Sequence, residues 1–334
     1  MSCTKTISVT AAAAAPGSES RLAQKFGGHY ASDWMSQLPS SWTPYIQLAR
    51  LHRPHGLIVV SLSHLFGVLL AAARLHASPA DTARVGGIVL LGALFCNSGA
   101  HAWNDLVDAP IDAQVERTRT RPIPRGAVTP AAALLFAASQ AVLAAGCLLL
   151  LLPAGARAPA VPTVAAILYY PFAKRQMFAP QLVLGACMGL AVLVGAAAMG
   201  MREAWMDPAA RCLAAATALW AVLFDTIYAH MDLKDDVKLG VNSLAVFVQG
   251  YARRVLALLG VGVSTLLYRA GVHAGMGAAY YGISVAACSV CIAGIVGLLD
   301  LEDRASCGKF CIFGFRFTGV AIVGGLLVTY LTSL

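Results

Sequence analysis

Residues 104–112 read Asn-Asp-Leu-Val-Asp-Ala-Pro-Ile-Asp and place three carboxylates at the end of a long apolar run. Acidic residues are otherwise scarce in this chain, which has 16 Asp and Glu among 334 residues. Asp105, Asp108 and Asp112 are spaced by three and four, so they share one face of a helix if that helix continues. Pro110 removes a helical hydrogen bond, and we therefore expect the helix to kink or end there.

The composition around this stretch indicates a membrane protein. Hydrophobic residues make up 58% of the chain and charged residues only 12%, whereas soluble domains carry about 25% charged residues. A membrane span needs roughly 20 mainly apolar residues. Nine runs qualify, at 55–73, 86–103, 128–152, 157–172, 180–201, 209–230, 243–268, 274–299 and 312–332, and the fourth is the weakest because it is short and rich in proline. The predicted fold class is an all-α, polytopic membrane protein, a bundle of about nine transmembrane helices.

The net charge of +8 does not indicate nucleic acid as a partner. If Arg50 and Arg53 lie inside, most loop Lys and Arg residues fall on that same side, which is the positive-inside bias of membrane proteins. Membrane topology therefore explains much of the basic charge. The nine cysteines lie mostly inside apolar runs, and we interpret them as free thiols.

A second acidic cluster closes the sixth predicted span, at Asp225, Asp232, Asp235 and Asp236. On a continuous helix, Asp232 and Asp236 return to within about 20° of Asp225, while Asp235 points to one side. Four predicted spans separate the two clusters, so both lie at the same membrane face. Carboxylates this close repel unless cations sit among them, and Mg²⁺ binds through a few carboxylates together with substrate phosphates.

Basic residues adjoin both acidic clusters. Residues 116–126 read Glu-Arg-Thr-Arg-Thr-Arg-Pro-Ile-Pro-Arg-Gly, and arginines bind the oxygens of phosphates in bidentate fashion. Carboxylates that hold a metal beside such arginines predict a site for a metal–diphosphate complex. The candidate diphosphate ligands are Arg117, Arg121, Lys174, Arg175 and Lys234. The alternative is an ordinary solvated loop for the arginines and a helix-end lysine for Lys174.

The sequence predicts two parts, an N-terminal tail and a membrane domain. Residues 1–43 are predicted to be a disordered N-terminal tail, although their basic, Ser-rich character also suits a weak transit peptide. Residues 44–334 are predicted to form the membrane domain. Arg50 and Arg53, just before the first span, are either membrane anchors or contacts for an anionic substrate such as a phenolic acid.

Two motifs in this sequence resemble a known family. Asn-Asp-x-x-Asp-x-x-x-Asp at 104–112, followed by Glu-Arg-Thr-x-x-Arg-Pro at 116–122, resembles the first motif of UbiA-type intramembrane aromatic prenyltransferases. Asp-Thr-Ile-Tyr-Ala-His-x-Asp-x-x-Asp-Asp at 225–236 resembles the second motif, and Tyr170 with Lys174 matches a shorter element between them. The second motif is similar to that of the 4-hydroxybenzoate polyprenyltransferase branch.

One stretch departs from the 4-hydroxybenzoate branch. That branch usually has Arg-x-Asp-Lys-Pro-x-Gly before the first span, whereas residues 50–56 here read Arg-Leu-His-Arg-Pro-His-Gly. This version is more similar to the fungal meroterpenoid prenyltransferases, which transfer farnesyl groups to polyketide-derived phenolic acids. The departure bears on the identity of the acceptor and leaves the chemistry unchanged.

The resemblance implies a Mg²⁺-dependent transfer of a prenyl group from its diphosphate to the aromatic carbon of a phenolic acid. The expected group is farnesyl, transferred in fungal meroterpenoid secondary metabolism. The implied metal ligands are Asn104, Asp105, Asp108, Asp112, Asp232 and Asp236, and Asp225 joins the aspartates as a catalytic carboxylate. Tyr170, Tyr228, Arg50 and Arg53 are implied to line the pocket for the allyl cation and the acceptor. The partners are then a prenyl diphosphate, a phenolic acid and the lipid bilayer, with no nucleic acid.

The sequence also fits three alternative functions less well. Within the family, the alternative is the 4-hydroxybenzoate polyprenyltransferase of ubiquinone biosynthesis. From a different class, an ion-coupled transporter also places acids within a membrane, but its sites lie near the midplane, whereas these clusters lie at helix ends. A membrane-bound assembly factor would need neither cluster. The expected location is the endoplasmic reticulum or another endomembrane, with the mitochondrial inner membrane as the alternative.

Overall fold

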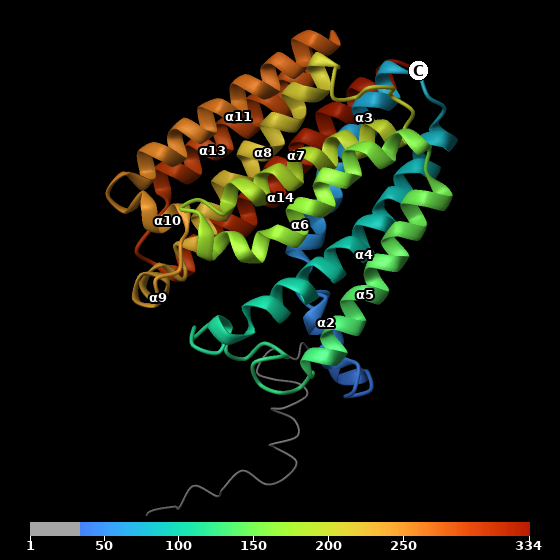
Figure 1. The fold of residues 1–334 in the computed structure, drawn as a ribbon. Coiled ribbons are helices and arrows are strands. Elements are labelled where there is room, and N and C mark those ends of the chain that lie inside the picture. The colour runs from blue at the N-terminus through green and yellow to red at the C-terminus, as the bar shows by residue number, and fades with distance from the viewer. Residues whose placement is uncertain (1–33) are drawn as a thin grey trace, which may run out of the picture.

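The computed structural model describes residues 34–334. Most of the predicted N-terminal tail, residues 1–33, therefore lies outside the described residues. The rest of that tail contains a short helix, η2 (Met35–Gln37), in which the side chain of Met35 is buried. From Thr43 onward the chain is a bundle of long helices (Figure 1).

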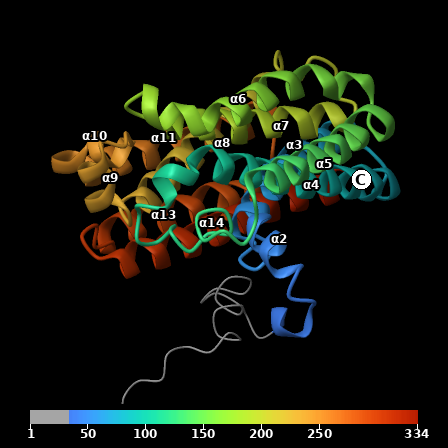
Figure 2. The ribbon, with the colours of Figure 1, turned by 60° about the horizontal axis from the view of Figure 1, so that its bottom comes forward.

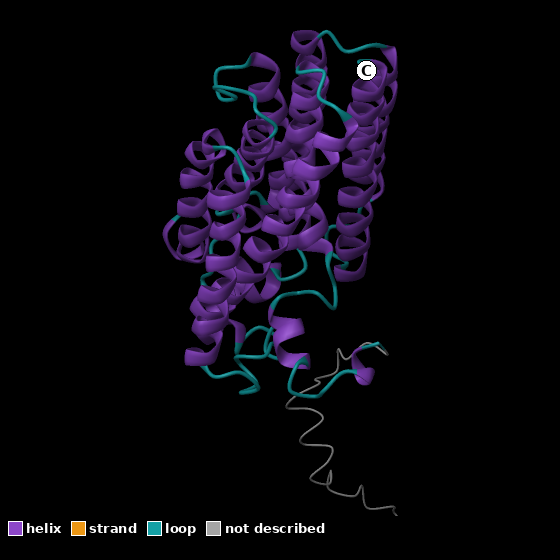
Figure 3. Cartoon of the chain, turned by 90° about the vertical axis from the view of Figure 1, so that its right-hand side faces the viewer, coloured by secondary structure: helices purple, strands orange, loops and turns teal. Residues whose placement is uncertain are grey.

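The long helices of the bundle follow the predicted spans. They are α3 (His55–Arg74), α4 (Pro79–Asp112), α5 (Pro130–Gly146), α6 (Arg157–Gln176), α7 (Gln181–Ala198), α8 (Pro208–Ala229), α11 (Ala252–Ala274), α13 (Ala287–Leu298) and α14 (Arg304–Thr332). Short helical turns extend two of them: η3 (Cys147–Leu151) follows α5, and α12 (Ala278–Tyr280) with η6 (Tyr281–Ala286) precedes α13. No strand occurs between residues 34 and 334 (Figure 3). The prediction of an all-α membrane protein is confirmed.

Fewer helices qualify as membrane spans by length and hydropathy than the nine spans predicted from the sequence. Eight helices in the described part of the chain are long and apolar enough to cross a membrane. The ninth, α6, has 20 residues but is less apolar, because it carries Arg157 at its start and Lys174 and Arg175 at its end. Its Val161, Val164 and Leu168 are nevertheless exposed on the bundle surface, so α6 still presents apolar side chains outward.

Short helices gather at one end of the bundle. α2 (Thr43–Leu48), α9 (Leu233–Leu239) and α10 (Leu244–Phe247) lie at the end away from the C-terminus in Figure 1. Figure 2 shows α9 and α10 at that end in a second view. The ends of α4 and α8 are at this same end, so both acidic clusters lie on one face of the bundle, as the count of spans predicts.

Two local predictions about these helix ends are corrected. The helix does not end at Pro110, because α4 continues through it to Asp112. The missing N–H of Pro110 removes only one hydrogen bond, within a turn of the helix terminus. The helix that carries Asp225 does end early, at Ala229, and Asp232 precedes a separate short helix, α9. The predicted stripe on one continuous helix is therefore wrong.

The core holds α3 close to α7 and α8. Trp220 packs edge-on against Phe315 at a ring-centroid distance of 4.9 Å, and its indole N–H donates to Oγ1 of Thr318 at 2.7 Å. Where α3 crosses α7, a Cβ atom added at Gly67 would lie 1.8 Å from the carbonyl oxygen of Val192. A Cβ at Gly195 would likewise lie 2.1 Å from the carbonyl oxygen of His64. The two helices approach this closely only because both positions are glycine.

Replacing Gly67 with alanine should therefore destabilise the bundle. The new methyl group meets backbone that cannot move aside, and overpacking of this kind costs about 1–3 kcal/mol. Gly87→Ala on α4 is a matched control, since Gly87 is also inside a helix but has no atom within 4 Å of an added Cβ. We expect the thermal unfolding midpoint in detergent to fall for Gly67→Ala and to hold or rise for Gly87→Ala. Equal midpoints would contradict the close crossing.

Candidate active site

A cavity of about 630 Å³ opens at the end of the bundle where the two acidic clusters meet. Side chains from α3, α4, α6, α7, α8 and α14 line it, together with the segments before α3, after α4 and after α8. Asp108, Asp112, Asp225, Asp232 and Asp236 are all among the lining residues. The cavity thus brings together five of the six aspartates predicted as catalytic.

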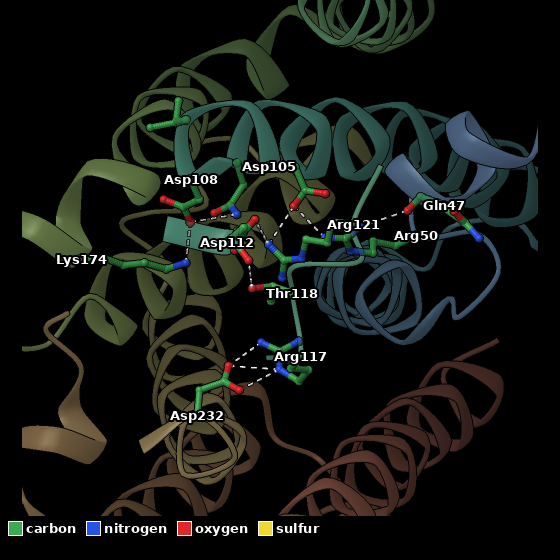
Figure 4. A network of polar contacts seen from close by, with 12 residues as sticks. Gln47, Arg50, Asp105, Asp108, Asp112, Arg117, Thr118, Arg121, Lys174 and Asp232 are labelled. Atoms are coloured by element: carbon green, nitrogen blue, oxygen red, sulfur yellow. Dashed lines mark hydrogen bonds and ion pairs between the residues drawn. The ribbon is translucent and has the colours of Figure 1, made fainter. Parts of the chain in front are cut away.

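The sixth, Asp105, is completely buried beside the cavity and joins two arginines. Its Oδ1 accepts hydrogen bonds from Arg50 at 2.6 Å and from Arg121 at 3.0 Å. Arg121 also donates to Oδ2 of Asp112 at 2.6 Å, so it lies between two carboxylates of α4 (Figure 4). Burial lowers the pKa of Arg121, but the pull of Asp105 and Asp112 outweighs it, and the net pKa is raised. Arg121 is therefore held as a cation.

Asp108 is paired with the end of α6. Nζ of Lys174 donates to Oδ2 of Asp108 at 2.7 Å, and Nδ2 of Asn104 donates to the same oxygen at 3.2 Å (Figure 4). Arg175 lies farther away, with 3.7 Å between its Nη2 and Oδ1 of Asp108. Lys174 thus connects α6 to the acidic face of α4.

The second cluster is held by the loop that follows α4. Nε of Arg117 donates to both carboxylate oxygens of Asp232, at 2.9 and 3.0 Å (Figure 4). Nη1 of the same arginine donates to the hydroxyl oxygen of Tyr228 at 3.1 Å. Burial, followed by the negative charge of Asp232, raises the pKa of Asp236 to about 7. Its carboxyl group therefore keeps a proton up to near-neutral pH.

Asp235 lies outside this arrangement. Its Oδ2 accepts a hydrogen bond from Arg304 at 3.0 Å, and Arg304 also donates to Glu116 at 3.1 Å. Asp235 does not line the cavity, in agreement with the prediction that it points to one side. The helical reasoning behind that prediction fails, because α8 ends before Asp232, but the separation of Asp235 from the cavity is observed.

The predicted diphosphate ligands divide into two groups. Arg117, Arg121 and Lys174 line the cavity. Arg175 does not, and its guanidinium donates to the carbonyl oxygen of Val107 at 3.0 Å. Lys234 is exposed and also lies outside the cavity lining.

The two predicted pocket tyrosines already face cations. Tyr170 and Tyr228 line the cavity. Nζ of Lys174 lies 5.6 Å from the ring centre of Tyr170, and Cζ of Arg117 lies 5.1 Å from that of Tyr228. A cation at this distance from a ring interacts favourably with its π-face. In this structure those faces are occupied by side chains.

The oxygen atoms at the cavity fit a hard divalent cation. Oδ1 of Asn104, Oδ2 of Asp105 and Oδ1 of Asp108 are buried without a hydrogen-bond partner, and Mg²⁺ prefers oxygen ligands of this kind. Within residues 34–334, however, no group of three or more His, Cys, Asp or Glu side chains is close enough to form a complete metal site. The donors present are thus compatible with Mg²⁺ only if the remaining ligands come from a substrate or from water.

Several lining residues were missed at the sequence level. His52, Asn97, His101, Arg125 and Arg316 all line the cavity. Burial, together with Arg50 and Arg53, lowers the pKa of His52 to about 4, so its imidazole is neutral. Asn97 and His101 precede Asp105 by eight and four residues, a spacing that puts all three on one helical face. The four-residue spacing of these polar side chains is visible in the sequence and could have identified Asn97 and His101.

Comparison with known proteins adds to this geometry. Residues 60–319 match the UbiA prenyltransferase family. The chain is 29% identical over 306 residues to Prenyltransferase stbC from Stachybotrys bisbyi, covering 90% of this chain and 92% of that protein. It is 31% identical over 303 residues to the mitochondrial 4-hydroxybenzoate polyprenyltransferase of Saccharomyces cerevisiae, covering 90% and 80% of the two chains.

A solved structure shares the fold. The UbiA homologue from Archaeoglobus fulgidus, whose structure is bound to GPP and Mg²⁺, superimposes with a TM-score of 0.66 over 86% of this chain and 99% of that chain. The two sequences are 16% identical, so this likeness concerns the arrangement of helices.

Proposed function

This chain belongs to the UbiA prenyltransferase family and is an aromatic prenyltransferase, and from that premise we propose the reaction and its substrates. The proposed reaction is the Mg²⁺-dependent transfer of a prenyl group from its diphosphate to a ring carbon of a phenolic acid. One observation carries the proposal: the two acidic clusters face one cavity, and three of the five aspartates that line it, Asp108, Asp112 and Asp232, form ion pairs with a lysine or an arginine.

In this proposal the acidic side chains divide between two duties. Asn104, Asp108 and Asp112 on α4, with Asp232 and Asp236 on the opposite side, would hold Mg²⁺. Mg²⁺ usually takes few protein carboxylates and fills its shell with phosphate oxygens, which agrees with a cavity that has no complete metal site in its described residues. Asp105 would keep Arg50 and Arg121 in position, because it is buried and bonded to both.

The cationic side chains would bind the diphosphate. Arg117, Arg121 and Lys174 line the cavity and carry donors that match phosphate oxygens. Bound Mg²⁺ would supply further positive charge to the leaving diphosphate. Together these charges favour breaking of the allylic C–O bond, since stabilisation of developing charge is a major contribution to catalysis.

The rest of the cavity suits an apolar tail and an aromatic ring. Its deeper lining includes Leu184, Met188, Ala191 and Ala221, which exclude water from the allyl cation. The cation would form a bond with a ring carbon of the phenol, the electron pair coming from the ring, and that carbon then loses its proton. Asp225 lines the cavity near this region and is the proposed proton acceptor.

The finer assignments are a farnesyl donor and a phenolic acid acceptor of a fungal meroterpenoid pathway. They are supported by residues 50–56, and by similarity to fungal proteins named prenyltransferases. The second candidate is 4-hydroxybenzoate polyprenylation, which the similarity to the yeast mitochondrial enzyme favours. The chain is an integral membrane protein; we propose an endomembrane location for the first reaction and the mitochondrial inner membrane for the second.

Asp232→Ala and Asp108→Ala should abolish turnover while leaving the bundle folded, because each removes a proposed metal ligand at the cavity. Asp235→Ala is the matched control, since Asp235 is three residues from Asp232 but bonds Arg304 outside the cavity. The measurement is diphosphate release from farnesyl diphosphate with Mg²⁺ and an acceptor, alongside the unfolding midpoint. A folded Asp232→Ala variant with near wild-type rate would contradict the two-cluster site.

Lys174→Ala should raise the apparent KM for the prenyl diphosphate much more than the KM for the acceptor. A charge-assisted contact is worth about 1.5–3 kcal/mol, which corresponds to roughly a ten- to hundredfold change. Lys234→Ala, in which an exposed lysine outside the cavity is lost, should leave the donor KM unchanged. If the two variants have the same donor KM, Lys174 is a membrane-end lysine and does not bind phosphate.

Arg53→Ala should weaken the use of a phenolic acid more than the use of its methyl ester. A carboxylate that enters beside several aspartates needs a cation close to it, and Arg53 lines the cavity three residues after Arg50, in the turn between α2 and α3. Both acceptors are assayed at a fixed concentration of farnesyl diphosphate, and kcat/KM is compared. Equal losses for acid and ester would assign Arg53 to anchoring the chain at the membrane surface.

A further inference from the structure

One wall of the cavity has no function in the proposed reaction. Asn97 and His101 line the cavity on the part of α4 that precedes the acidic cluster. Asn97 is only 4% exposed, and its Nδ2 has no hydrogen-bond partner. A buried amide donor left in this state costs about 1–3 kcal/mol, so the position calls for a partner.

The pair continues the polar face of α4 into the apolar part of the bundle. Asn97, His101 and Asp105 are spaced by four and share that face. At 1.5 Å per residue, Asn97 lies about 12 Å along the helix axis from Asp105. The cavity lining beside Asn97 includes Cys96, and Met188 comes from the facing α7. The amide therefore lies farther from the charged groups at the mouth of the cavity than Asp105 does.

The first turn of α3 fixes where this pair can point. A Cβ atom added at Gly56 would lie 2.8 Å from Nε2 of His101 and 3.3 Å from Oδ1 of Asn97. Gly56 thus allows α3 to lie directly against both side chains. Gly56 covers the side of the pair that faces α3. Because Asn97 also lines the cavity, a hydrogen-bond acceptor for its Nδ2 would have to come from a molecule bound in the cavity.

The chemistry of the pair limits what that partner is. Neither residue is an anion, so a divalent cation is not the expected ligand. Phosphate oxygens have their proposed partners in the arginines and Lys174 at the mouth, which bind Asp105 and Asp108 about one to three helical turns farther along α4. A prenyl tail is hydrocarbon and offers no oxygen atom. The partner left by these exclusions is an uncharged oxygen atom of the aromatic acceptor.

We propose that Asn97 and His101 form a subsite that binds a ring hydroxyl of the acceptor, an inference that rests on the proposed function. The acceptor would then be held at two points, its carboxylate by Arg53 near the mouth and its hydroxyl by Nδ2 of Asn97. The ring between them lies beside the diphosphate-binding side chains. This subsite selects hydroxylated rings over rings that lack the group, because a site built to hydrogen-bond a hydroxyl rejects analogues without it.

The test compares two ligands on two proteins. Orsellinic acid and 2-methylbenzoic acid differ by the two ring hydroxyls, and neither requires turnover to be studied as a ligand. Binding to the full-length, detergent-solubilised chain is measured from the rise in unfolding midpoint with ligand concentration. The variants are Asn97→Leu, which keeps the volume but removes the amide, and Ser98→Ala as control. Ser98 is the next residue, is buried, bonds the carbonyl of Leu94 and does not line the cavity.

The expected result is a loss of discrimination in one variant only. The wild-type chain and Ser98→Ala should bind orsellinic acid roughly tenfold or more tightly than 2-methylbenzoic acid, in line with a contact of about 1.4 kcal/mol. Asn97→Leu should bind the two acids about equally. Equal discrimination in Asn97→Leu and wild type would overturn the subsite, as would a wild-type chain that binds neither acid.

Turnover assays separate this inference from the function on which it rests. A wild-type chain that prenylates orsellinic acid but binds the two acids equally well overturns the subsite and leaves the reaction in place. A chain that discriminates between the two acids but transfers no prenyl group from any prenyl diphosphate keeps the subsite and overturns the proposed reaction. If Asn97→Leu does not fold, Asn97→Ser, which retains a shorter donor, replaces it and should show partial discrimination.

Discussion

The pairing of Asp105 with Arg50 and Arg121 is the contact on which the mouth of the cavity depends. It joins three separate segments: the turn before α3, the last turns of α4 and the loop after α4. A buried ion pair contributes little net stability, but loss of one partner leaves an uncompensated charge at a cost of about 3–5 kcal/mol. The three segments therefore keep their relative positions or lose them together.

Under the proposed function, the other ion pairs at the mouth would let the site keep its charges paired both with and without substrates. Asp108 with Lys174 and Asp232 with Arg117 place opposite charges in contact, so neither buried charge stands alone. A metal–diphosphate complex carries both signs. Carboxylates can turn to the metal and cations to the phosphate oxygens, and each charged group keeps an opposite charge as its neighbour. The exchange avoids the large penalty for a bare charge in a low-dielectric site.

How much the sequence predicts depends on the range of the interactions involved. Hydrophobic runs and two acidic clusters predict the all-α class, the common face and the family, because each is set by local pattern. The break after Ala229 and the passage of α4 through Pro110 are not local, since packing of neighbouring segments overrides propensity there. Whether a lysine lines a cavity also depends on tertiary packing, which is why the sequence predicts both Lys174 and Lys234 as diphosphate ligands although only Lys174 lines the cavity.

The tyrosines connect the ion pairs to the chemistry. Arg117 donates to Asp232 and the Tyr228 hydroxyl, and also lies over the Tyr228 ring. If Arg117 turns to a diphosphate under the proposed reaction, the face of that ring becomes free at the same moment that an allyl cation is about to form. An aromatic face stabilises a cation more strongly where water is excluded. The guanidinium would thus protect the π-face until the substrate that generates the cation has arrived.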